Sequence, residues 1–157
     1  MEHNFLMLEL EFGNQTSDSR WSADFFRKIV ETALKRLDSA DKQVELGIQL
    51  VGPERSQELN RQYRHKDKPT DVLSFPLNEQ PADNALNQYG ILPLGDIVIC
   101  LEVAEKQATE SAIPLKEELA RLVVHGLLHL FGYDHERSEA DEETMSGLEE
   151  EILKLLD

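Results

Sequence analysis

The sequence has a single cysteine, no long apolar run and few basic residues for its number of acids. Cys100 alone cannot form a disulfide within the chain, which excludes a disulfide scaffold and favours a reducing compartment. No stretch approaches the roughly 18 consecutive apolar residues of a membrane-spanning helix, and the N-terminus lacks the features of a secretory signal. We therefore expect a cytoplasmic protein with no membrane partner.

The charge is strongly negative, because 31 acidic residues face 16 basic ones, for a net charge of −15. Nonspecific binding to nucleic acid needs many cations that displace counterions from phosphates, so we expect no general DNA partner. The excess is uneven, since residues 134–157 contain ten acids and two bases. Residues 61–68 (RQYRHKDK) form the one basic concentration in the chain. It is either a solvated helix end and turn or part of a binding site.

The chain is expected to form one domain over residues 1–157, because this length suffices for a core and no repeat divides it. Alternating apolar residues predict strands over 6–12 and 44–50, and a helical pattern over 21–37 joins them. Two strands joined through a helix are most simply parallel. Two further strands are predicted: a short one over 71–75, between two prolines and suited to a sheet edge, and an interior one over 97–101.

Helical patterns account for most of the remaining sequence. A second helix follows Gly52 and Pro53, and the others are expected over 102–111, 115–131 and 138–156. In the last one Ser138 precedes Asp141 by three positions, as in a helix cap, and the buried residues are expected to be Met145, Leu148, Ile152 and Leu155. Residues 76–94, with three prolines, are expected to be an irregular connection. The pattern predicts an α+β fold with a small, mixed, four-stranded sheet packed with several helices.

Three histidines provide the main chemical signal, in the segment HGLLHLFGYDH. His125 and His129 are four residues apart, so they lie on one helix face one turn apart and can hold one metal ion. The surrounding residues are apolar nearly all round, which predicts a buried helix with a narrow polar stripe. Gly132 can end this helix in a left-handed turn that returns His135 to the pair. We therefore expect a metal site at the end of a buried helix.

The alternative for each histidine alone is a structural role, with His125 and His129 in the core and His135 on the surface. The joint spacing of all three favours a metal site. Three imidazoles with a fourth position open to water are typical of a catalytic zinc site, whereas structural zinc usually has four protein ligands. The spacing is that of the metzincin proteases, H-E-x-x-H-x-x-G-x-x-H, except that Gly126 replaces the glutamate. Because that glutamate is the general base, ordinary proteolysis is not expected; the glycine either leaves room near the metal or allows close helix packing.

The histidine segment, residues 59–76 (LNRQYRHKDKPTDVLSFP) and residues 94–100 (LGDIVIC) together resemble the YbeY family of bacterial rRNA-maturation endoribonucleases. The resemblance covers nearly the whole chain, in the right order. It implies a metal-dependent endoribonuclease specific for single strands, which acts on the 3′ end of small-subunit rRNA and in ribosome quality control. It also implies one Zn2+ per chain held by His125, His129 and His135, an essential Arg64, and the small ribosomal subunit or the ribosome as partner.

The residues give these expectations a chemical basis. A planar guanidinium such as that of Arg64 can hold two oxygens of a phosphodiester as negative charge grows on them; its alternative role is as a cation at a helix end. Lys66 and Lys68 are candidates for contacts with backbone phosphates, although surface solvation also explains them. Tyr63 is either a stacking platform for bases or a core residue. Asp71 and Asp134 are candidate acids, with turn roles as the alternative.

Two other functions fit the same residues. The first is a metal-dependent peptidase with metzincin-like ligand spacing, in which a peptide adds to the edge strand over residues 71–75. The second is a ribosome assembly factor without catalytic activity, whose metal is structural. The proton acceptor cannot be assigned from the sequence, since Gly126 has no side chain.

Overall fold

The computed structural model describes residues 7–39, 42–77, 90–133 and 138–156. The elements, in chain order, are β1 (Met7–Asn14), α1 (Ala23–Arg36), β2 (Gln43–Val51), α2 (Pro53–Arg64), β3 (Val72–Pro76), β4 (Ile91–Cys100), α3 (Leu101–Ser111), α4 (Leu115–Leu130) and α5 (Glu139–Leu155). No helix of these described ranges has the length and apolar character needed to cross a membrane.

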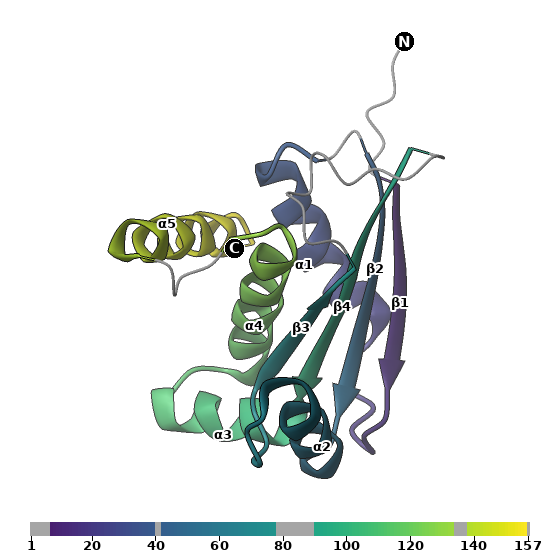
Figure 1. Cartoon of the computed structure of the whole chain (residues 1–157), viewed down its shortest axis with the longest axis vertical. Helices are drawn as coiled ribbons and strands as arrows, with labels where there is room; N and C mark the ends of the chain where they lie inside the picture. The colour runs from purple at the N-terminus through teal and green to yellow at the C-terminus, as the bar shows by residue number, and fades with distance from the viewer. Residues whose placement is uncertain (1–6, 40–41, 78–89, 134–137, 157) are drawn as a thin grey trace.

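The strands form one mixed sheet in the order β1-β2-β4-β3. β1 pairs with β2 and β2 with β4 in parallel, whereas β3 pairs with β4 in the antiparallel direction. The α+β class, the parallel first pair, the interior position of β4 and the edge position of β3 are thereby confirmed. Among the described residues, the edge position leaves one side of β3 without a strand partner. α4 lies beside β3 (Figure 1).

Two layers of apolar side chains hold the sheet. The larger core joins one sheet face to the helices packed against it, and its fully buried side chains include Phe26, Ile48, Ile97, Leu119 and Leu127. On the other face α2 covers a smaller cluster built from Leu59, Val51, Leu73 and Val98. α2 therefore packs near the end of the sheet where β2 finishes and β3 begins, and this places its C-terminus beside the edge strand.

Three details differ from the sequence predictions. The fourth strand begins at Ile91, within the expected connection, rather than at Ile97, and Leu101 starts α3 instead of ending the strand. The sequence pattern does not reveal this strand because its pairing with β2 shifts register between Pro93 and Gly95. Gly95 has φ +126° and lies against the Phe75 carbonyl. Leu155 is wrong as a core residue, since it is 58% exposed, whereas Met145 and Ile152 are buried as predicted. Residues 78–89 of the expected connection lie outside the described residues.

Both predicted helix ends have the expected chemistry. The Ser138 hydroxyl accepts a hydrogen bond from the Asp141 backbone N–H at 3.1 Å, which caps α5. At the end of α4, Gly132 has φ +98° and donates to His129 O, while Tyr133 N donates to Leu128 O. This pair of bonds is the Schellman arrangement that turns a chain out of a helix. His135, three residues beyond Gly132, lies outside the described residues.

Gly126 lets α4 approach the sheet closely. A Cβ atom at this position would lie 3.1 Å from Ile97 Cγ2 on β4 and 3.1 Å from Ser74 Oγ on β3. The Ser74 hydroxyl donates a hydrogen bond of 3.1 Å to the Gly126 carbonyl oxygen. The glycine is therefore needed for close packing, which was one of the two explanations that its position in the sequence left open.

This contact gives a stability prediction. We expect Gly126→Ala to lower the free energy of unfolding by about 1–3 kcal/mol, because the added methyl group overpacks a dense contact. Gly147→Ala on α5 is the matched control, since a Cβ there meets nothing within 4 Å, and we expect it to raise stability by up to about 1 kcal/mol. Urea unfolding followed by circular dichroism measures both. Equal effects of the two substitutions would contradict the packing role of Gly126.

Candidate active site

A groove of about 670 Å³ runs along the edge of the sheet. The C-terminal end of α2, the following turn, β3 and one face of α4 form its walls. Its lining includes Arg64, Arg121, His125 and His129, together with Asp71 as its one carboxylate among the described residues. The groove therefore brings together the basic segment and two of the three predicted metal ligands, which are about 60 residues apart in the sequence.

His125 and His129 point toward one another from successive turns of α4. Their Nε2 atoms are 3.1 Å apart, and their rings are 4.7 Å apart between centroids, at an interplanar angle of 74°. Zinc–nitrogen bonds of about 2.0–2.1 Å at tetrahedral angles place two ligand nitrogens about 3.3 Å apart. The observed separation is close to that value, so the two imidazoles fit one metal ion between them.

Glu149 of α5 contacts His125 at Nδ1, the ring nitrogen that does not face His129. Its Oε1 is in close hydrogen-bond contact with His125 Nδ1, and the two side chains are only 18% and 26% exposed. A carboxylate at Nδ1 holds the proton on that nitrogen and leaves the Nε2 lone pair for a metal. The carboxylate and the imidazole together form the histidine–carboxylate pair that commonly supports a metal ligand.

The described residues include two of the three predicted ligands, His125 and His129. Within residues 7–39, 42–77, 90–133 and 138–156, no group of three His, Cys, Asp or Glu side chains is arranged to hold a metal ion. The third predicted ligand, His135, lies outside these ranges, as does the candidate acid Asp134. The three-histidine site thus stays a prediction, with the geometry of its first two members in its favour.

Arg64 and Tyr63 form the opposite wall of the groove, at the last turn of α2. The helix stops there because His65 adopts a left-handed conformation, with φ 60°, and its N–H donates to Arg61 O. Tyr63 is 57% exposed, and its ring packs edge-on against Phe75 of β3 with centroids 5.1 Å apart. Of the two roles considered for Tyr63, the exposed position excludes the core role.

Hydrogen bonds from buried side chains of α2 fix the basic turn that follows Arg64. Ser56 Oγ bonds both the N–H and the carbonyl of Thr70 at 2.9 Å, and Asn60 Nδ2 donates to Lys68 O at 2.8 Å. Lys66 and Lys68 are exposed on this turn and are not among the residues that line the groove. Their proposed phosphate contacts would therefore lie at its margin.

A network of polar side chains closes the groove at the first turns of α4. Arg121 donates two hydrogen bonds to the buried Glu118, from Nε at 3.0 Å and from Nη2 at 2.7 Å. With its amide nitrogen turned toward them, Gln107 lies 2.7 Å from Glu118 Oε2 and 3.2 Å from Asp71 Oδ2. The bonds to Glu118 raise the pKa of Arg121, so its guanidinium stays charged. Asp71 also accepts from the Val72 N–H at 2.7 Å, which gives it the turn role considered for it.

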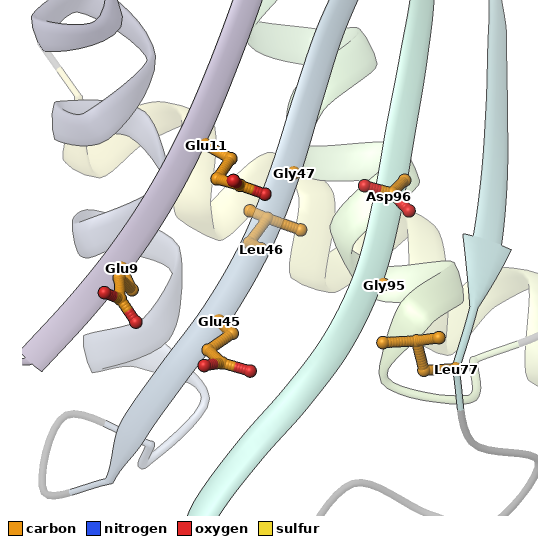
Figure 2. Close-up of a pocket in the computed structure, with 8 residues that line it drawn as sticks. All are labelled: Glu9, Glu11, Glu45, Leu46, Gly47, Leu77, Gly95 and Asp96. Carbon is orange, nitrogen blue, oxygen red and sulfur yellow. The ribbon is translucent and has the colours of Figure 1, made fainter.

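A second hollow is acidic and lies on the sheet face that α2 partly covers, opposite the larger core. Glu9 and Glu11 of β1, Glu45 of β2 and Asp96 of β4 line it on the part of the sheet that α2 leaves uncovered (Figure 2). Carboxylates of this density repel a polyanion. The basic groove and this surface therefore differ sharply in the ligands that they attract.

The sequence analysis missed two residues that contribute to the site, Glu149 and Arg121. Glu149 is one of many acids near the C-terminus, and its contact with His125 depends on how α5 packs against α4. Arg121 does carry a signal, since it precedes His125 by four positions and His129 by eight and so shares their helix face. The expectation of a metal site overlooked it because arginine is not a metal ligand.

The chain is similar to proteins of known activity along almost its whole length. The family model described as "Endoribonuclease YbeY" matches residues 11–157. Proteins named endoribonuclease YbeY are 42% identical in Persephonella marina and 44% identical in Acinetobacter baumannii, each over 151 residues. These alignments cover 96% of this chain and 92% and 94% of the two relatives.

The fold is also similar to a solved structure. The solution structure of TM1509 from Thermotoga maritima matches with a TM-score of 0.64 and 28% identity, over 94% of this chain and 88% of that one. The family match and the two relatives identify the family that the histidine segment suggested. The chain belongs to the YbeY family of endoribonucleases, enzymes that hydrolyse RNA.

Proposed function

We propose that the chain cuts single-stranded RNA in the groove between α2, β3 and α4, with one Zn2+ held by His125, His129 and His135. The observation that supports this most directly is the 3.1 Å approach of two imidazole Nε2 atoms in a groove that Arg64 also lines. A single strand fits a groove open along a sheet edge, since its backbone can follow the cationic wall while its bases stack on exposed rings.

Each side chain has a distinct part in this reaction. Zinc, when bound, supplies positive charge that polarises a phosphoryl oxygen and lowers the pKa of a water. Glu149 keeps the proton on His125 Nδ1, so that Nε2 of His125 presents a lone pair to the metal. Arg64 donates N–H groups to nonbridging oxygens of the phosphate, and its planar fork matches two of them at once.

Tyr63 provides the best surface for an unpaired base. Its ring is 57% exposed and is held by edge contact with Phe75, so little side-chain entropy is lost when a base stacks on it. Lys66 and Lys68 would contact phosphates that leave the groove over the basic turn. These contacts depend on charge more than on shape, so they add affinity without sequence preference.

The biological substrate we propose is the 3′ end of small-subunit rRNA, in maturation and in ribosome quality control, with the ribosome or its small subunit as partner. The charge of −15 supports a partner that brings the RNA to the enzyme, because free RNA is repelled by most of the surface. Such a role places the enzyme in the bacterial cytoplasm. Cleavage of precursor rRNA on isolated small subunits, compared with the same RNA free in solution, tests this partner.

The two alternative functions have less support. A peptidase would need a general base at position 126, where even a Cβ atom meets Ile97 and Ser74 at 3.1 Å. An assembly factor with a structural metal would need a site closed by protein ligands, whereas the two histidines open onto the groove.

Loss of either a predicted ligand or the arginine should remove activity. We expect His125→Ala and Arg64→Glu to abolish cleavage of single-stranded RNA while circular dichroism and thermal unfolding stay close to wild type. Arg36→Gln, at an exposed ion pair with Glu151 on other helices, is the control and should cut normally. Equal cleavage by wild type and both groove variants would reveal a contaminating nuclease.

Glu149 should act through the metal. We expect Glu149→Gln to weaken zinc binding by about 10- to 100-fold, because His125 loses the carboxylate that fixes its proton and orientation. Competition with a chelator of known affinity measures this change. Glu150→Gln, at the next and more exposed acid of α5, should leave zinc affinity unchanged. Equal zinc affinity in all three proteins would refute the supporting role.

Removal of the metal should separate catalysis from folding. The core around Leu119, Leu127 and Ile97 is fully buried without any contribution from a metal. We therefore expect the chelated protein to stay folded, with a cooperative unfolding transition, and to lose RNA cleavage. Added zinc should restore the activity. Complete unfolding on chelation would instead indicate a structural metal.

A further inference from the structure

Arg121 occupies a position in the groove that neither the metal site nor Arg64 explains. It lies one helical turn before His125 on the same face of α4, and both side chains line the groove. Four residues of helix correspond to about 6 Å along the axis. The guanidinium is turned further from the histidines, because it binds Glu118, which lies three residues earlier on α4. It therefore suits a phosphate next to the one that the metal site would hold.

The guanidinium is fixed and partly open. Nε and Nη2 are bound to the two oxygens of Glu118, which is 3% exposed, whereas the Arg121 side chain is 42% exposed. Among the described residues, Nη1 has no acceptor within hydrogen-bond distance. Arg121 thus presents donors to the groove in one orientation. Because the side chain is already ordered, little side-chain entropy is lost when it binds a phosphate.

An ion pair that only stabilised α4 would not need these features. Glu118 is buried and also faces Gln107, which bridges it to Asp71. Without Arg121, this end of the groove would hold two carboxylates and would repel a phosphate. The arginine pairs with one of these carboxylates, Glu118, and also lines the groove beside His125.

We propose that Arg121 forms a second phosphate subsite, which binds the phosphodiester adjacent to the scissile one and sets the register of the RNA strand. This inference rests on the proposed function of the groove. Arg121 is a binding residue in this role, and it should act on the affinity for RNA more than on the chemical step, which belongs to the metal site and Arg64.

Steady-state kinetics on a single-stranded RNA oligonucleotide tests the subsite. Since a single loss of Arg121 leaves Glu118 buried and unpaired, the variant combines Arg121→Gln with Glu118→Gln. We expect its KM to rise by roughly 10- to 100-fold, the cost of a hydrogen bond to a charged group, with a smaller change in kcat. The slope of log affinity against log salt should fall by about 0.7, the value for one phosphate contact on a single strand. Arg36→Gln is the control, with a side chain 40% exposed in an ion pair away from the groove.

Neutral linkages locate the contact. A methylphosphonate placed next to the cleavage site should raise KM for the wild type by as much as the double substitution does, and should have no further effect on the variant. Additive effects at every position, an unchanged KM, or an equal loss in Arg36→Gln would overturn the subsite. A wild-type enzyme that cuts no RNA would show instead that the proposed function itself is wrong.

Discussion

The close approach of α4 to the edge of the sheet is the constraint on which the site depends. Gly126 and Ser74 meet there without an intervening side chain, and the hydroxyl of one binds the carbonyl of the other. The contact fixes the rotation of α4, so that one face carries the buried core and the other directs His125 and His129 past β3. Because α2 packs on the other sheet face at the same edge, Arg64 reaches the groove from the opposite side. A larger residue at position 126 would move the helix and separate the two halves of the site.

The placement of charge explains how so acidic a chain can act on a polyanion. The uncovered sheet face carries Glu9, Glu11, Glu45 and Asp96, and these side chains face solvent together (Figure 2). The groove has two arginines and two imidazoles against a single lining carboxylate, Asp71, among the described residues. The acidic surface repels a polyanion, whereas the arginines of the groove offer it hydrogen-bond donors. Net charge therefore limits nonspecific binding, while the local field selects the site.

Periodic sequence features predicted the fold well because each element buries one face. The alternation in β1 and β2, the helix between them and the edge strand bounded by prolines follow from local patterns. The start of β4 was missed because Pro93 and Gly95 resemble a connection, whereas the bulge at Gly95 accommodates both in a strand. The spacing of His125 and His129 gave their convergence directly. Glu149 could not be found in this way, since its contact depends on the packing of α5 across α4.

The position of the carboxylate distinguishes this site from a metal protease with the same histidine spacing. In such a protease the acid stands next to the first histidine on the same helix and takes a proton from water. Here that position is a packing contact, and the carboxylate comes from α5 and binds His125 from the side away from the groove. The acid thus holds a predicted ligand and does not line the groove. A peptide bond carries no charge for Arg64 and Arg121 to bind, whereas a phosphodiester carries one at every step. Under the proposed function, the groove thus has Arg64 of α2 and Arg121 of α4 where such a protease has its base, and this exchange suits the groove to RNA.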